Sequence, residues 1–184
     1  MISEHVHIPV TLTTYSSERI NKGIWLVLMH INRIPPHVGI IFDGLYSSLT
    51  IKGKETNIDF LTLEKMITQK KIETAYVELS PHPVFSIDFL RENFLIQLAK
   101  FESVKENEAT CLSPLKLFFN EFYYLKLISP DLLHDCMMEL SENNFLLSFC
   151  NTQPTKLNTL AIPYYNIKEL NERIKTERQP YTNN

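Results

Sequence analysis

Two short segments of the chain carry residue types that can do chemistry together. His37 directly precedes Val38-Gly39-Ile40, a run that is typical of a buried strand. Cys111 stands in Thr110-Cys111-Leu112-Ser113-Pro114, a segment that is typical of the start of a helix. The start of a helix lowers the pKa of a thiol, and an imidazole on a rigid strand is a suitable base for it. If the two side chains meet in the fold, they predict attack of a thiolate on a carbonyl carbon.

Each of these residues also has a simpler interpretation. A cysteine outside a disulfide is most often a small buried hydrophobic residue, and a histidine at the start of a strand is most often a surface group. Pro114 favours a position of Cys111 at the N-cap or just before it, because proline fits the first helical turn and not later ones. Cys136 and Cys150 are expected in the core. No two cysteines have metal-ligand spacing, so we expect neither a metal site nor a cofactor.

The two segments together resemble those of a known superfamily. His37-Val38-Gly39-Ile40-Ile41-Phe42-Asp43-Gly44, followed much later by Thr110-Cys111-Leu112-Ser113, is similar to the circularly permuted papain-like hydrolases. These are relatives of the NlpC-type cell-wall peptidases and of lecithin retinol acyltransferase, and in permuted members the histidine precedes the cysteine. The resemblance covers roughly residues 35–125. It implies that Cys111 is the nucleophile and His37 the general base. An acyl-enzyme would form, followed by hydrolysis or by transfer to an amine or alcohol.

The superfamily usually has a third polar residue, on the strand after the histidine strand, that orients the imidazole. In this chain that strand is Leu45-Tyr46-Ser47-Ser48-Leu49-Thr50, and Ser48 aligns best with the position. This departs from the usual His, Glu, Asn or Gln, because a serine has no charge to stabilise an imidazolium. Glu78, on a predicted third strand, is a substitute with suitable chemistry, or else a solvated carboxylate.

The substrate implied by the resemblance is a small peptide, amide or acyl ester. Tyr46 and Trp25 could line an apolar cleft for it, although the core is the default location for both aromatic side chains. Thr110 is a third candidate for contact with the substrate, because it precedes the nucleophile. The second hypothesis is a non-catalytic binding or interaction module on a similar α+β scaffold. The distance between the Cys111 thiol and the His37 ring would discriminate between the two hypotheses.

Composition narrows the class of protein. With 184 residues, of which 44% are hydrophobic, we expect a single domain over residues 1–175 and a loose polar tail over 176–184. The net charge of −3 argues against nucleic-acid binding by phosphate neutralisation. Lys70 and Lys71, with Lys65 nearby, are interpreted as a solvated helix end.

Location and assembly are less constrained by the sequence. The chain has no apolar stretch long enough to span a membrane and no signal-peptide pattern at Met1. Three cysteines fit a reducing compartment, so we predict a cytoplasmic protein, although removal of a signal peptide would leave the same pattern. The sequence leaves the oligomeric state open.

The predicted fold is of the α+β class, with a small antiparallel sheet packed against helices. Strands are predicted over 5–14, 38–42, 45–52, 75–79 and 145–150. Helices are predicted over 18–31, for about ten residues after Asp59, and over 86–104, 114–127 and 167–175, with another that starts at Ser129-Pro130-Asp131 and ends near 140. Segment 18–31 would also suit a strand, because Trp25, Val27 and Met29 alternate.

Overall fold

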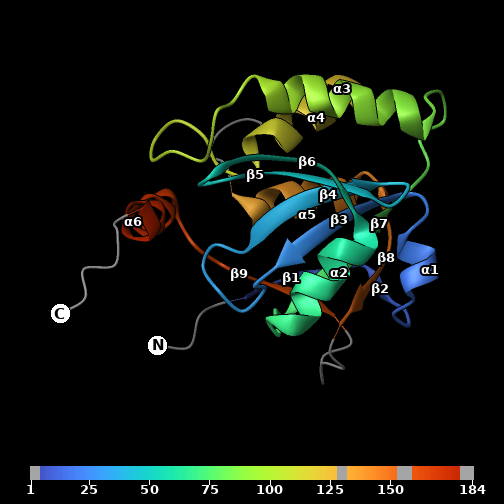
Figure 1. The fold of residues 1–184 in the computed structure, drawn as a ribbon, viewed down its shortest axis with the longest axis horizontal. Coiled ribbons are helices and arrows are strands. Elements are labelled where there is room, and N and C mark those ends of the chain that lie inside the picture. The colour runs from blue at the N-terminus through green and yellow to red at the C-terminus, as the bar shows by residue number, and fades with distance from the viewer. Residues whose placement is uncertain (1–4, 128–131, 153–158, 179–184) are drawn as a thin grey trace.

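A seven-stranded sheet with helices on both faces organises the molecule (Figure 1). The computed structural model describes residues 5–127, 132–152 and 159–178. The strand order is β2-β8-β7-β3-β4-β5-β6, and neighbours run antiparallel except β2 and β8, which are parallel. A second, two-stranded sheet pairs β1 with β9. The predicted α+β class is therefore confirmed, although the main sheet is larger than the small sheet that the sequence predicts.

The elements follow one another in a mixed order. The strands are β1 (His5–Ile8), β2 (Thr11–Leu12), β3 (Ile24–Met29), β4 (His37–Phe42), β5 (Leu45–Thr50), β6 (Gly53–Asp59), β7 (Thr74–Leu79), β8 (Leu146–Asn151) and β9 (Leu160–Pro163). The helices are α1 (Ser17–Ile20), α2 (Phe60–Gln69), α3 (Ile87–Ala99), α4 (Ser113–Phe122), α5 (Leu133–Glu142) and α6 (Ile167–Arg178).

The predicted helix over residues 18–31 is wrong. The chain forms only the short helix α1 there, and Gly23, with a φ of 83°, leads into β3. All six residues of β3 are buried, because this strand lies in the middle of the sheet. A strand that is covered on both faces is apolar throughout, so its hydrophobic residues match helical spacing as well as strand spacing.

Other differences concern the ends of elements. The strand predicted over 5–14 is two short strands in different sheets, α3 ends at Ala99, and α4 ends at Phe122. The strands β6 and β9 were not predicted from the sequence. The helix start predicted at Ser129-Pro130-Asp131 lies outside the described residues, as does most of the predicted tail, whereas 176–178 belong to α6.

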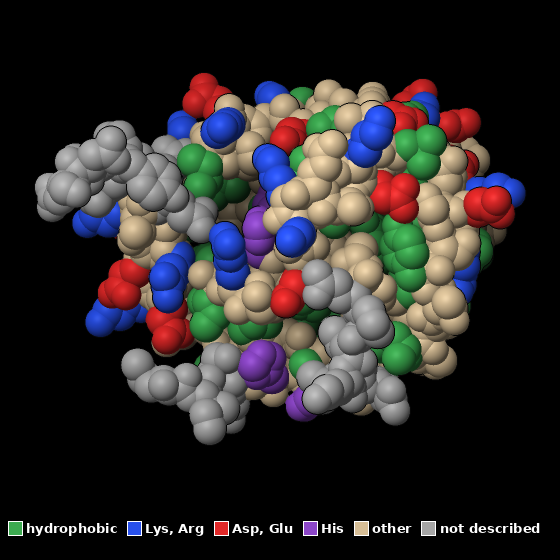
Figure 2. All heavy atoms as spheres, turned by 60° about the horizontal axis from the view of Figure 1, so that its bottom comes forward, with side chains coloured by type: hydrophobic (Ala, Val, Ile, Leu, Met, Phe, Trp, Pro, Cys, Tyr) green, Lys and Arg blue, Asp and Glu red, His purple; other side chains and the backbone are tan. Residues whose placement is uncertain are grey.

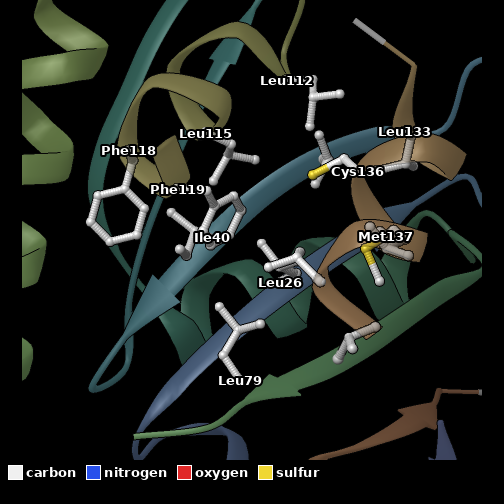
Figure 3. Packing of buried hydrophobic residues seen from close by; sticks show 14 of the residues in the cluster. Leu26, Ile40, Leu79, Leu112, Leu115, Phe118, Phe119, Leu133, Cys136 and Met137 are labelled. Atoms are coloured by element: carbon white, nitrogen blue, oxygen red, sulfur yellow. The ribbon is translucent and has the colours of Figure 1, made fainter. Parts of the chain in front are cut away.

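Alternating residues of the central strands enter two separate cores. On one face, α3, α4 and α5 cover residues such as Leu26 and Ile40, and Figure 3 shows Phe119 of α4 and Met137 of α5 beside them. On the other face, α1 and α2 cover a second core that includes Trp25, Ile41, Tyr46, Phe60 and Tyr76. Each strand residue therefore belongs to either the α3/α4/α5 face or the α1/α2 face.

We expect Phe118→Ala to be among the most destabilising single substitutions. The ring is fully buried and contacts the rings of Phe42, Phe94, Phe119, Phe122 and Tyr123. Its removal should lower the free energy of unfolding by about 3–5 kcal/mol in urea denaturation, since it leaves a cavity. The matched control is Ile96→Ala on α3, where the side chain is 58% exposed and the change should stay within about 0.5 kcal/mol. Equal effects of the two substitutions would contradict this packing.

Candidate functional site

His37 is held at the start of β4 by a contact with the next strand. The hydroxyl oxygen of Tyr46, on β5, lies 3.2 Å from Nε2 of His37. The ring of Tyr46 crosses β4 over Gly39, where a β-carbon would clash with the ring. His37, Gly39 and Ile41 alternate along β4, so the His37 ring lies on the α1/α2 face of the sheet together with Tyr46.

The polar contacts continue from Tyr46 to a carboxylate. Ser48, two residues along β5, donates its hydroxyl proton to Glu55 of β6 at 3.1 Å, and it lies close enough to Tyr46 to affect the pKa of the Tyr46 hydroxyl. Ser48 and Glu55 are direct cross-strand partners. We call His37, Tyr46, Ser48 and Glu55 the polar chain. It runs from a half-buried histidine to a half-buried glutamate across three strands.

Burial sets the protonation states in the polar chain. Burial, and to a smaller extent the nearby His30, lowers the pKa of His37 from 6.5 to about 4. The pKa of Tyr46 is raised well above its ordinary value, first by burial; the nearby Ser48 hydroxyl opposes this rise, and the charges of Glu55 and of a Cys111 thiolate add to it. At neutral pH the imidazole is therefore uncharged and the tyrosine is protonated. A ring that carries its proton on Nδ1 accepts the Tyr46 hydroxyl proton at Nε2.

Cys111 lies one residue before Leu112, the N-cap of α4, and is half-buried. The turn that leads into α4 is fixed by its neighbours: the Thr110 hydroxyl accepts from the Leu112 N–H at 3.1 Å, and the Ser113 hydroxyl accepts from the Thr110 N–H at 2.9 Å. The predicted position of Cys111, at or just before the N-cap, is confirmed. Thr110 thus has a structural role in shaping this turn.

The structure gives His37 a partner other than Cys111. Cys111 packs against the core on the α3/α4/α5 face, whereas the His37 ring is on the α1/α2 face, and the ring hydrogen-bonds Tyr46. The Cys111 thiolate nevertheless contributes to the raised pKa of Tyr46, so the thiol lies within electrostatic range of that hydroxyl. A direct Cys111–His37 pair stays a prediction, and Tyr46 is the group that interacts with both.

Glu78 and Trp25 have partners away from His37. The Glu78 carboxylate forms an ion pair with Arg19 and accepts a hydrogen bond from Ser148 at 2.8 Å. Trp25 is fully buried, its indole N–H donates to the carbonyl oxygen of Lys22 at 2.7 Å, and the Arg19 guanidinium lies 5.4 Å from its ring centre. The contacts of Glu78 stabilise the neighbouring strands β7 and β8, and Trp25 belongs to the core.

Two features of the polar chain are absent from the sequence-based predictions. Tyr46 is fully buried, which confirms its default location in the core, but its contact with His37 was not predicted. Glu55 is not among the predicted site residues, because Gly53 indicates the end of the return strand. A usable signal exists: β5 and β6 join through a tight turn at Ile51-Lys52, and counting back from the Thr50–Gly53 pair places Glu55 opposite Ser48.

Comparison with known proteins adds no assignment. No protein-family model matches the chain, and no curated protein and no solved structure matches it significantly. Among the described residues, no three His, Cys, Asp or Glu side chains are grouped so that they could hold a metal ion. The helices in that part of the chain are all too short or too polar to cross a membrane.

We expect His37 to make stability depend on pH. Between pH 6.5 and about 4 the unfolded chain binds a proton at this position and the folded chain does not, so stability falls as the pH falls through this range. The loss between pH 7 and pH 4 should be on the order of 3 kcal/mol. His37→Gln should remove this part of the pH dependence in urea denaturation, whereas His5→Gln, at an exposed position, should behave like the wild type. Parallel profiles for wild type and His37→Gln would refute the prediction.

We expect Gly39→Ala to act through Tyr46. The added methyl group would clash with the Tyr46 ring, and the resulting displacement should lower the free energy of unfolding by about 1–3 kcal/mol. In a Tyr46→Leu background the same substitution should have little effect, because the ring is gone. A double-mutant cycle in urea measures this coupling. An unchanged effect of Gly39→Ala in the two backgrounds would show that the contact does not constrain position 39.

Proposed function

We propose that the protein is a cysteine-dependent hydrolase of amide or ester bonds, or an acyltransferase, with Cys111 as nucleophile and His37 as base. The observation that carries the proposal is the Tyr46 hydroxyl. It lies 3.2 Å from Nε2 of His37, and the charge of a Cys111 thiolate affects its pKa. On this proposal, the Cys111 sulfur comes within hydrogen-bond distance of the Tyr46 hydroxyl when substrate binds, and the hydroxyl then transmits the thiol proton to His37. The order of His37 and Cys111 in the sequence, which resembles that of permuted papain-like hydrolases, supports the same chemistry.

The proposed first step forms a bond between the sulfur of Cys111 and the acyl carbon of the substrate. The thiol proton passes to the oxygen of Tyr46 as the Tyr46 proton passes to Nε2 of His37, and the electron pair of the carbonyl bond moves to its oxygen. The two transfers occur together, because the raised pKa of Tyr46 disfavours a separate tyrosinate. With a pKa of about 4, His37 is neutral at neutral pH but is a weak base, so the proposal requires it to accept the proton in the same step in which the carbon–sulfur bond forms.

The second step releases the first product. The carbonyl bond reforms, the bond to the leaving amine or alcohol breaks, and that group receives the proton back from His37 through Tyr46. The acyl group remains on Cys111 as a thioester. Water, or an amine or alcohol acceptor, then attacks the thioester by the same proton path and frees the sulfur. Ser48, which donates to Glu55, lies close enough to the Tyr46 hydroxyl to affect its pKa.

A non-catalytic binding module is the second candidate function. The observation that favours it is the placement of the two side chains on different faces: His37 belongs with the core under α2, and Cys111 packs against the core under α4. On this alternative, the polar chain only supplies a hydrogen-bond partner for the buried hydroxyl of Tyr46, and Cys111 only packs against the core. The two candidates differ in the reactivity that they predict for the Cys111 thiol.

Iodoacetamide labelling of the native protein measures that reactivity. Cys136 and Cys150 are only 2% and 1% exposed, so labelling of the folded chain reports on Cys111. If Tyr46 and His37 accept the thiol proton, Tyr46→Phe and His37→Gln should each slow labelling at neutral pH by at least about tenfold. Tyr46→Phe keeps the ring over Gly39 and removes only the hydroxyl. Glu78→Gln is the control and should label at the wild-type rate.

An activated ester supplies the second readout. Incubation with p-nitrophenyl acetate should leave an acetyl group on Cys111 that mass spectrometry detects, and Cys111→Ser should lack this thioester. Equal labelling rates in all variants, together with no acetyl adduct in the wild type, would favour the binding module and overturn the hydrolase proposal.

A further inference from the structure

Three nitrogen-bearing residues belong to segments that come together beyond the end of β3. His30 directly follows this strand, Arg33 lies in the loop between β3 and β4, and Lys70 is the C-cap of α2. Arg33 and Lys70 are both close enough to His30 to lower its pKa, after the larger effect of burial. We call these three residues the basic cluster. It brings the end of a central strand, a loop and the end of a helix together at one place.

Among the residues that the structure describes, neither cation of the basic cluster has a carboxylate partner. Within residues 5–127, 132–152 and 159–178, no carboxylate lies within ion-pair distance of Arg33 or Lys70. The adjacent pocket is not uniformly positive, because both acidic and basic side chains line it. Its lining residues are Ile34 and, from α6, Glu169, Glu172, Arg173 and Thr176. The basic cluster is therefore a local positive site on a chain whose net charge is −3.

The backbone holds the basic cluster in position. The N–H of Arg33 donates to the carbonyl oxygen of His30 at 2.8 Å, and the N–H of Ile31 donates to the carbonyl oxygen of Glu73 at 3.2 Å. His30 has a φ of 54°, a left-handed conformation that turns the chain sharply. The N–H of Lys70 donates to Met66 of α2 at 3.0 Å. A ligand that binds here would meet groups whose backbone is already ordered, which reduces the entropy lost on binding.

One face of the molecule has a hollow beside basic side chains. Figure 2, which brings the bottom of Figure 1 forward, shows a histidine side chain within a hollow that has Lys and Arg side chains around it. A guanidinium and an ammonium at the edge of a recess are the donors that recognise carboxylate and phosphate oxygens, and a neutral imidazole adds one N–H donor. A bound oxyanion would also relieve the repulsion between the two like charges.

We propose that His30, Arg33 and Lys70 form a binding site for the oxyanion group, carboxylate or phosphate, of a small ligand. The site does not depend on thiol chemistry, because none of its residues takes part in the proposed acyl transfer. It lies close to the polar chain, since His30 and His37 interact electrostatically. If the hydrolase proposal also holds, the natural ligand is an anionic substrate whose charged group is held beside His37.

Titration of the protein with inorganic phosphate and, separately, with acetate tests the site. The readout is the histidine Hε1 signals in NMR spectra at constant ionic strength, with the His30 signal identified by its loss in His30→Asn. Asparagine tolerates the left-handed backbone at this position. We expect a saturable shift of the His30 signal with a Kd in the millimolar range or tighter. Saturation by only one of the two anions would assign the ligand to that class, and saturation by both would assign a general oxyanion site.

Substitutions of Arg33 and Lys70 test whether these residues bind the anion. Arg33→Gln and Lys70→Gln should each weaken binding by about tenfold, since each loses a charge-assisted hydrogen bond, whereas Arg33→Lys should retain more of it. The control is Arg91→Gln on α3, whose guanidinium pairs with Asp88 and which should bind like the wild type. The absence of a saturable shift with either anion, or wild-type binding in Arg33→Gln and Lys70→Gln, would overturn the proposal. Cys111→Ser should bind normally, which separates this site from the hydrolase proposal.

Discussion

Burial of the central strands between two helical layers is the constraint on which the rest of the structure depends. β3 is buried along its whole length, and β4 and β7 flank it on either side. Their alternating side chains must fill two cores, one under α3, α4 and α5 and one under α1 and α2. Because a residue on a central strand cannot reach both cores, this arrangement decides which polar side chains can meet. It places His37 and Tyr46 under the same layer.

The chemistry of the polar chain is a consequence of this burial. A tyrosine hydroxyl that enters a core must find a partner or lose the hydrogen bonds that it made with water. Tyr46 finds His37, whereas the buried hydroxyls of Tyr76 and Tyr123 have no hydrogen-bond partner among the described residues. The same low polarity keeps His37 neutral. The packing of the Tyr46 ring over Gly39 thus also places the Tyr46 hydroxyl beside the His37 imidazole, which can receive a proton.

Positive charge is concentrated at the surface near the end of β3. The chain as a whole is slightly acidic, yet Arg33 and Lys70 remain without an ion-pair partner in the described part of the chain. Most ion pairs there join residues of one helix or loop, such as Arg91 with Asp88, and add little stability. Arg33 and Lys70 lower the pKa of His30, and His30 in turn contributes to the lowered pKa of His37, so positive charge at this end of the sheet is linked through His30 to the polar chain.

Local signals in the sequence determined several elements directly. Asp43-Gly44 predicted the hairpin between β4 and β5, and both residues adopt the left-handed conformation that such a turn needs. Asp59 and Ser86 predicted two helix starts, and each side chain caps the helix that follows. These features could be predicted because they depend on residues only a few positions apart.

The tertiary structure alone decided which distant groups meet. The identity of β3 as a strand, the pairing of Ser48 with Glu55, and the faces to which His37 and Cys111 belong all depend on contacts between segments far apart in the chain. The sequence named His37, Cys111 and Ser48 as a candidate site. Only the fold placed Tyr46 beside His37, because strand register and the choice of face are set by packing across the whole sheet and not by neighbouring residues.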